Sequence, residues 1–159
     1  MSSSQGRKQC KDPKTVRVYV IDNASSCEKL LQSFQSRYTF ERSYIGLDCE
    51  WVDKKGQFAP VALLQIATPL FDCFLFRLCK MDGQMPKAVK QILEDSTILK
   101  FGVGIQIDAK RLSEMFGIQV RGCVDLRDII TQRTQVESGD KLRFVILAHP
   151  LIILTLPPF

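Results

Sequence analysis

The sequence has few of the residues that many enzymes and metal sites require. Histidine occurs once, at His149, which excludes zinc fingers with two histidine ligands and HExxH proteases. A Ser-His-Asp or Cys-His enzyme would have to use that same residue. No Walker A sequence is present, so a P-loop nucleotide site is excluded as well. The apolar stretch 144–156 is shorter than the roughly 20 residues that a bilayer-spanning helix needs.

Cysteines are present, but their spacing is irregular. None of them forms a CxxC pair, and most lie within apolar runs. We expect buried, reduced thiols and therefore an intracellular, reducing compartment, with a disulfide framework as the alternative. No targeting signal distinguishes nucleus, cytoplasm and mitochondrion. The cysteines are Cys10, Cys27, Cys49, Cys73, Cys79 and Cys123.

The positive charge is concentrated near the ends of the sequence. A chain of 159 residues, 45% hydrophobic and 25% charged, is typical of one globular domain. Of the net charge of +5, residues 1–17 contribute +4 (five basic, one acidic), whereas residues 18–140 contribute −1 (15 basic, 16 acidic). We predict a basic polar arm at residues 1–14 that either attracts phosphates or is merely solvated. The arm has no apolar run, so it does not indicate a signal peptide or a membrane anchor.

Hydrophobic periodicity predicts an α/β fold. Strands come first and then alternate with helices, which is typical of a mixed sheet flanked by helices, and neither a repeat nor a second domain is indicated. The expected strands are 16–21, 44–52, 61–67, 72–78, 98–103 and 120–124. A first helix is expected after the capping residues 23–25, and it would carry Leu30, Leu31 and Phe34. Further helices are expected at 86–94, at 105–116 and from 125 to 132.

Two acids share one face of the strand at 44–52. Because side chains alternate along a strand, Asp48 and Glu50 point the same way, about 7 Å apart. They could simply face water on a half-exposed strand. The next segments, VALLQIA and CFLFRL, are however apolar on both faces, as interior strands are. Adjacent carboxylates near a core need a compensating cation. Oxygen ligands without histidine or thiolate suit Mg²⁺ or Mn²⁺, and paired ions of this kind hydrolyse phosphodiesters.

A third candidate acid is Asp108, in the first turn of the helix expected at 105–116. An acid that only complements the helix dipole is the alternative interpretation. The preceding GVG is not a dinucleotide fingerprint, because Ile107 occupies the place of the third glycine. We interpret Asp125 and Asp128 as a helix cap and an exposed residue of its first turn.

These motifs together resemble the DEDD (RNase D-like) 3′–5′ exonucleases. The resemblance is carried by DxE in one strand, LLQ in the next, and the stretch ILEDSTILKFGVGIQIDAKRL…FGIQVRGCVDLRDI, and it covers about residues 15–142. It implies a ribonuclease H-like mixed β-sheet and a partial 3′–5′ exonuclease domain at 15–142. It also implies stepwise removal of nucleotides from DNA or RNA 3′ ends with two ions of Mg²⁺ or Mn²⁺.

The resemblance also implies roles for individual residues. Asp48, Glu50 and Asp108 would be the catalytic residues and metal ligands. Trp51 would lie against the terminal nucleotide, unless it is a core residue. Arg111 would face phosphate, unless it is a solvated surface arginine.

The sequence departs from the family pattern in its last part. The family has a fourth acid in a Tyr-x3-Asp or His-x3-Asp motif on a late helix, and its Tyr or His holds the attacking water. Here no tyrosine follows Tyr44, no aspartate follows Asp140, and Ile153 stands where His149 would need its aspartate. We therefore expect a C-terminally incomplete fold, an apolar tail at 143–159 from truncation or alternative splicing, and impaired catalysis. The alternative is a non-catalytic form that binds nucleic acid or a partner.

Overall fold

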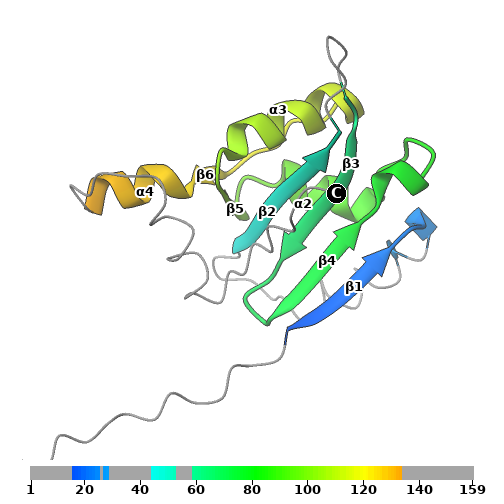
Figure 1. The fold of residues 1–159 in the computed structure, drawn as a ribbon, viewed down its shortest axis with the longest axis horizontal. Coiled ribbons are helices and arrows are strands. Elements are labelled where there is room, and N and C mark those ends of the chain that lie inside the picture. The colour runs from blue at the N-terminus through cyan, green and yellow to red at the C-terminus, as the bar shows by residue number, and fades with distance from the viewer. Residues whose placement is uncertain (1–15, 26, 29–43, 53–58, 134–159) are drawn as a thin grey trace, which may run out of the picture.

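The computed structural model describes residues 16–25, 27–28, 44–52 and 59–133. These residues form a six-stranded mixed sheet in the order β1-β4-β3-β2-β5-β6, with helices beside it, as predicted (Figure 1). The strands are β1 (Arg17–Ile21), β2 (Tyr44–Trp51), β3 (Val61–Ala67), β4 (Asp72–Phe76), β5 (Leu99–Gly102) and β6 (Cys123–Asp125); the helices are η1 (Leu78–Lys80), α2 (Lys87–Glu94), α3 (Ile105–Phe116) and α4 (Leu126–Arg133).

The predicted elements are present, with shifts at their ends. The strand expected to reach residue 78 ends at Phe76, because the 3-10 turn η1 begins at Leu78. Pro86 is the residue before α2 rather than its first residue. Residues 24, 25, 27 and 28 are helical, but the helix predicted to carry Leu30, Leu31 and Phe34 extends outside the described residues.

Strand β2 lies inside the sheet, between β3 and β5. It pairs antiparallel with β3 and parallel with β5, and β5 continues in parallel to β6. On the other side β4 joins β3 antiparallel and β1 in parallel. This interior position excludes the interpretation of β2 as an edge strand, while Asp48 and Glu50 remain partly exposed.

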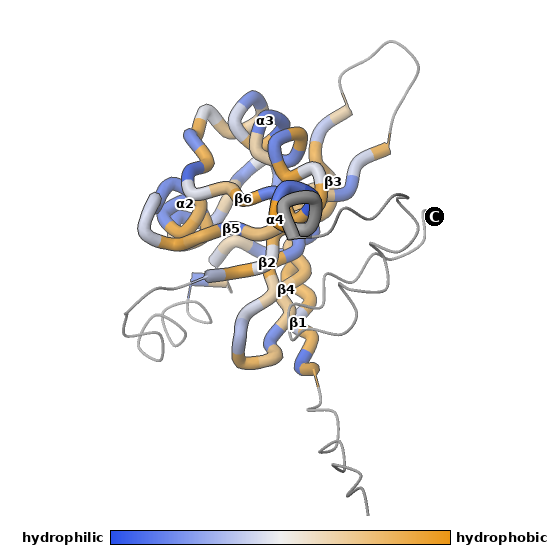
Figure 2. Tube along the Cα trace, turned by 90° about the vertical axis from the view of Figure 1, so that its left-hand side faces the viewer, coloured by the Kyte–Doolittle hydropathy of each residue, from blue (hydrophilic) through white to orange (hydrophobic). Residues whose placement is uncertain are grey.

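The hydrophobic core lies between one face of the sheet and the helices α2 and α3. Leu47, Leu64 and Phe76, all fully buried, come from three neighbouring strands of the sheet. They form one cluster with Val89 of α2 and Leu112 of α3. Figures 1 and 2 show α2 and α3 on the same side of the sheet, whose strands are coloured mostly as hydrophobic. Among the described residues, no helix is long and apolar enough to cross a membrane.

The cysteine prediction is confirmed for three residues and wrong for two. Cys27, Cys49 and Cys73 are buried free thiols, and burial raises the pKa of Cys27 to about 12. Cys79 is exposed because it belongs to η1, where the chain has left the sheet, and Cys123 is only partly buried. Cys10 lies outside the described residues.

Two glycines place the start of α3 against β2. A Cβ at Gly102 would lie 2.6 Å from the carbonyl oxygen of Leu47, so only glycine allows β5 to approach β2 this closely. Gly104 precedes α3 with φ +69, a left-handed conformation that glycine adopts without steric cost. The strand–glycine–helix step therefore fixes where the first turn of α3 lies relative to β2.

We expect Gly102→Ala to lower the free energy of unfolding by about 2–3 kcal/mol, because the added methyl group would overlap a backbone oxygen that cannot move freely. Urea unfolding of the full chain measures it. Gly83→Ala is the control, since Gly83 also has a positive φ but open space around it, and its loss should be about 1 kcal/mol. Equal losses at both positions would show that β5 and β2 can separate without cost.

Candidate metal centre

Asp48 and Glu50 lie side by side in β2, on the face opposite Leu47 and Cys49. Asp48 is directly opposite Gln65 of β3, whose Nε2 donates a hydrogen bond of 3.1 Å to Asp48 Oδ2. The register of the two strands shifts between Glu50 and the next residue, a β-bulge of the kind that re-aims side chains near functional sites. Both acids are partly buried.

Asp108 brings a third carboxylate from the first turn of α3. It is only 4% exposed, which rules out an acid that merely complements the helix dipole at the surface. Burial raises its pKa to about 7, with further contributions from Asp48, Glu50 and Asp125, and among the described residues Arg111 acts in the opposite direction. The pKa of Asp48 is raised to about 6, first by burial and then by Glu50. The fold thus places Glu50 and Asp48 close enough to Asp108 for their charges to raise its pKa further.

The three acids fit a divalent cation by their chemistry. Carboxylate oxygens are the ligands that Mg²⁺ and Mn²⁺ prefer, and a bound cation would offset both the burial of these charges and their mutual repulsion. Within the described residues, no group of three or more histidine, cysteine, aspartate or glutamate side chains is arranged closely enough to hold a metal ion. The three acids therefore influence one another electrostatically, but they do not form a closed set of metal ligands in this structure.

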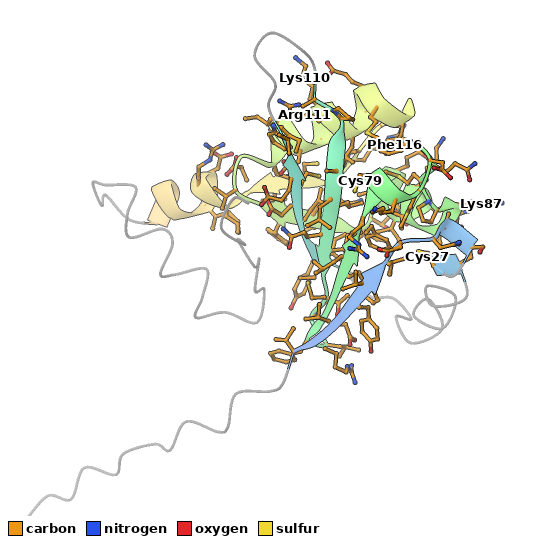
Figure 3. All side chains as sticks on the ribbon, turned by 45° about the vertical axis from the view of Figure 1, so that its right-hand side comes forward. Cys27, Cys79, Lys87, Lys110, Arg111 and Phe116 are labelled. Atoms are coloured by element: carbon orange, nitrogen blue, oxygen red, sulfur yellow. The ribbon has the colours of Figure 1, made fainter. Side chains whose placement is uncertain are left out.

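Trp51 and Arg111 form a stacked pair beside these acids. The guanidinium carbon of Arg111 lies 4.0 Å from the centre of the Trp51 ring, and its Nη1 donates a hydrogen bond of 2.9 Å to the carbonyl oxygen of Ala59. Figure 3 shows Arg111 where α3 meets the end of the sheet. Arg111 is partly exposed, and cation–π stacking and a backbone acceptor hold its head group, while its contact with a phosphate stays a prediction. Trp51 packs against the core as well, and its contact with a nucleotide stays a prediction.

Asp125 is the helix cap that the sequence predicts, and it also accepts a hydrogen bond from the residue before α3. Its Oδ1 accepts a hydrogen bond of 3.0 Å from the backbone N–H of Arg127, in the first turn of α4. Its Oδ2 accepts one of 3.0 Å from the N–H of Gly104, and the Arg127 guanidinium pairs with both oxygens. Hydrogen bonding to Arg127 is the main reason why the pKa of Asp125 is lowered. Asp125, 6% exposed, thus joins the start of α4 to the start of α3, while Asp128 is exposed as predicted.

Gln65 is a candidate site residue to which the sequence analysis gave no role, although it ends the LLQ segment that contributes to the family resemblance. It is 4% exposed, and among the described residues its Oε1 is the buried side-chain polar atom without a hydrogen-bond partner. Leaving such an acceptor unpaired costs about 1–3 kcal/mol. The signal in the sequence was a glutamine within the apolar segment VALLQIA. No sequence signal linked Asp125 to Gly104, because that contact depends on the pairing of β5 with β6.

Comparison with known proteins places this arrangement among nucleases. A family model described as 3′–5′ exonuclease matches residues 18–149, beyond the boundary at 142 that the sequence suggests. The human exonuclease 3′–5′ domain-containing protein 2 is 46% identical over 86 residues, which are 52% of this chain and 14% of that protein. The mouse bifunctional 3′–5′ exonuclease/ATP-dependent helicase WRN is 30% identical over 112 residues, 69% of this chain and 8% of that protein. The chain thus spans less than a sixth of the length of either relative.

Solved structures agree with the sequence relatives. The EXD2 exonuclease domain soaked in Mn has a TM-score of 0.66 and 33% identity, over 84% of this chain and 71% of that one. The same domain soaked in Mg and GMP has a TM-score of 0.64 and 34% identity, over 87% of this chain and 72% of that one. The ribonuclease H-like fold expected from the sequence is confirmed by this similarity.

We expect Asp125→Ala to lower the free energy of unfolding by about 2 kcal/mol, because it removes a helix cap and the acceptor for the Gly104 N–H together. Asp128→Ala is the matched control: it removes an exposed acid of the same helix and should change stability by less than about 0.5 kcal/mol. Urea unfolding of both variants checks this. If the two losses are alike, the hydrogen bonds that Asp125 accepts contribute nothing measurable to stability.

The raised pKa values predict that the metal-free protein becomes less stable as pH rises. Asp108 and Asp48 ionise at about 3.8 when unfolded but at about 7 and about 6 when folded, so the unfolded state loses its protons first. The free energy of unfolding should therefore fall from about pH 4 to about pH 7. Urea unfolding in chelator at several pH values measures this slope.

Asp108→Asn should flatten that slope, because it removes the larger of the two shifts. Acids whose pKa is lowered by folding, such as Asp95 and Asp125, change the stability only below pH 3.8, their ordinary pKa. They therefore do not affect the slope between about pH 4 and pH 7. If the Asp108→Asn variant has the same slope as the unsubstituted chain, folding does not raise the pKa of Asp108.

Proposed function

The chain belongs to the 3′–5′ exonuclease family, and on this basis we propose that it carries the catalytic centre of such an enzyme, acting on the 3′ ends of nucleic acid. The observation that carries the proposal is the buried Asp108, whose pKa is raised by burial and by the neighbouring acids Asp48, Glu50 and Asp125, with Arg111 as the opposing cation among the described residues. An uncompensated cluster of this kind is costly for a fold and useful for binding a divalent cation. Family membership and local chemistry therefore point to the same residues.

Asp48, Glu50 and Asp108 would hold the divalent ions, and two ions of Mg²⁺ or Mn²⁺ are proposed. When bound, such ions polarise the phosphate and activate water for attack on the phosphodiester. The soaking of EXD2 exonuclease domain crystals in Mn, and in Mg with GMP, supports this choice of metal and of nucleotide substrate. The protein supplies the carboxylate oxygens, and the interior position of β2 and the burial of Asp108 limit the access of water to them.

Trp51 and Arg111 would bind the substrate together. Because Arg111 already covers the Trp51 ring, a nucleotide would meet the stacked pair rather than the indole alone. The guanidinium offers N–H donors for a phosphate oxygen, and its charge lies near the acids without neutralising them. The basic arm at 1–14 would add sequence-independent attraction to the phosphate backbone.

We propose the exonuclease unit at residues 15–142, with the tail at 143–159 outside it and a reducing intracellular compartment as its location. After Asp108 the sequence offers no Tyr-x3-Asp or His-x3-Asp motif. A site that lacks a metal ligand and a water-positioning group loses several kcal/mol of transition-state stabilisation, about a hundredfold or more in rate. We therefore expect this chain to be a slow exonuclease. The same observation favours the second candidate function, a non-catalytic module that binds nucleic acid or a partner.

Incubation of 5′-labelled single- and double-stranded DNA and RNA with the 159-residue chain and Mn²⁺ tests the proposal. We expect a slow ladder of products shortened from the 3′ end, abolished by chelator and reduced about a hundredfold or more by Asp48→Asn/Glu50→Gln. Asp82→Asn/Glu94→Gln, which removes two acids outside the cluster, should leave the ladder unchanged.

A ladder that persists in the Asp48→Asn/Glu50→Gln variant would assign the activity to a contaminant or to another site. If the unsubstituted chain gives no ladder but shifts the labelled oligonucleotides in a gel, the non-catalytic binding function replaces the enzymatic one.

A further inference from the structure

The hydrogen bonding of Gln65 is one-sided. Its Nε2 donates to Asp48 Oδ2 at 3.1 Å, whereas its Oε1 is buried and has no hydrogen-bond partner among the described residues. Gln65 as a whole is only 4% exposed, so solvent has little access to its amide. A glutamine kept for the fold alone would use both ends of its amide, because buried polar groups are almost always paired.

The amide provides one thing that an apolar side chain could not, namely an N–H on the Asp48 carboxylate. The geometry favours this use, because Gln65 and Asp48 are direct cross-strand partners and lie on the same face of the sheet. A donated hydrogen bond fixes the orientation of the carboxylate and favours its charged form, the form that binds a cation. The unpaired Oε1 lowers the stability of the fold, and this loss accompanies the contact with Asp48.

We propose that Gln65 is a positioning residue, which orients Asp48 for divalent-cation binding at the expense of fold stability. The inference rests on the proposed function, since it assumes that Asp48 is a metal ligand. Gln65 does not need to touch metal or substrate: it acts through Asp48. Residues that orient a metal ligand typically change metal affinity ten- to a hundredfold when they are removed.

The proposal predicts opposite changes in two measurable properties. Gln65→Met keeps the length of the side chain but removes both the N–H and the unpaired oxygen. The fold should therefore be at least as stable, while the Kd for Mn²⁺ should rise about tenfold or more. A purely structural glutamine would give the reverse, lower stability with unchanged metal affinity.

The experiment measures Mn²⁺ binding to the full 159-residue chain without substrate, by the electron paramagnetic resonance signal of free Mn²⁺, and urea unfolding in chelator. Leu63→Met is the matched control: Leu63 lies on the same strand and face, opposite Glu50, and has no polar group to lose. Its Kd should equal that of the unsubstituted chain. Asp48→Asn sets the baseline for a chain without the ligand.

A Gln65→Met variant that binds Mn²⁺ as tightly as the unsubstituted chain would overturn the inference and leave the proposed function intact. A clear loss of stability in that variant would also overturn it, because the unpaired oxygen would then carry no cost. If the unsubstituted chain binds no more Mn²⁺ than Asp48→Asn does, the proposed metal site itself is wrong and the inference falls with it.

Discussion

Repulsion between buried carboxylates is the constraint on which the candidate site depends. Asp108 is nearly inaccessible to solvent and lies within electrostatic range of Asp48 and Glu50, with Arg111 as the opposing charge. Burial and mutual repulsion raise the pKa of Asp108 to about 7 and that of Asp48 to about 6. Such a group is costly for a fold, and it is the observation on which the proposed cation site rests.

The rest of the fold brings these acids together and keeps them there. Gly102 lets β5 lie close to the backbone of β2, so that α3 starts beside the acids of that strand. Asp125 then ties the start of α4 to Gly104, the residue from which α3 begins. Gln65 holds Asp48 from the neighbouring strand. Each contact joins segments far apart in the sequence, and each places polar groups or tight backbone contacts where a simpler core would have apolar side chains.

Much of the fold and part of the site could be predicted from local pattern. The strand at 61–67 and the helix at 105–116 were found with the predicted bounds, because their apolar periodicity is strong. Asp48 and Glu50 could be placed on one face by alternation alone. The environments of Arg111 and Cys79 could not, since an arginine stacked on Trp51 and a cysteine in a 3-10 turn have no local signature.

The sequence by itself determined the α/β class and the family, and it nominated the three candidate acids, because these depend on periodicity and on short motifs. Only the tertiary structure decided that Asp108 is buried, that Arg111 covers Trp51, and that Gln65 bonds to Asp48 with one end of its amide unpaired. The physical reason is that burial and hydrogen bonding depend on which strands and helices become neighbours. That information lies in long-range pairing of the sheet, not in any one stretch of residues.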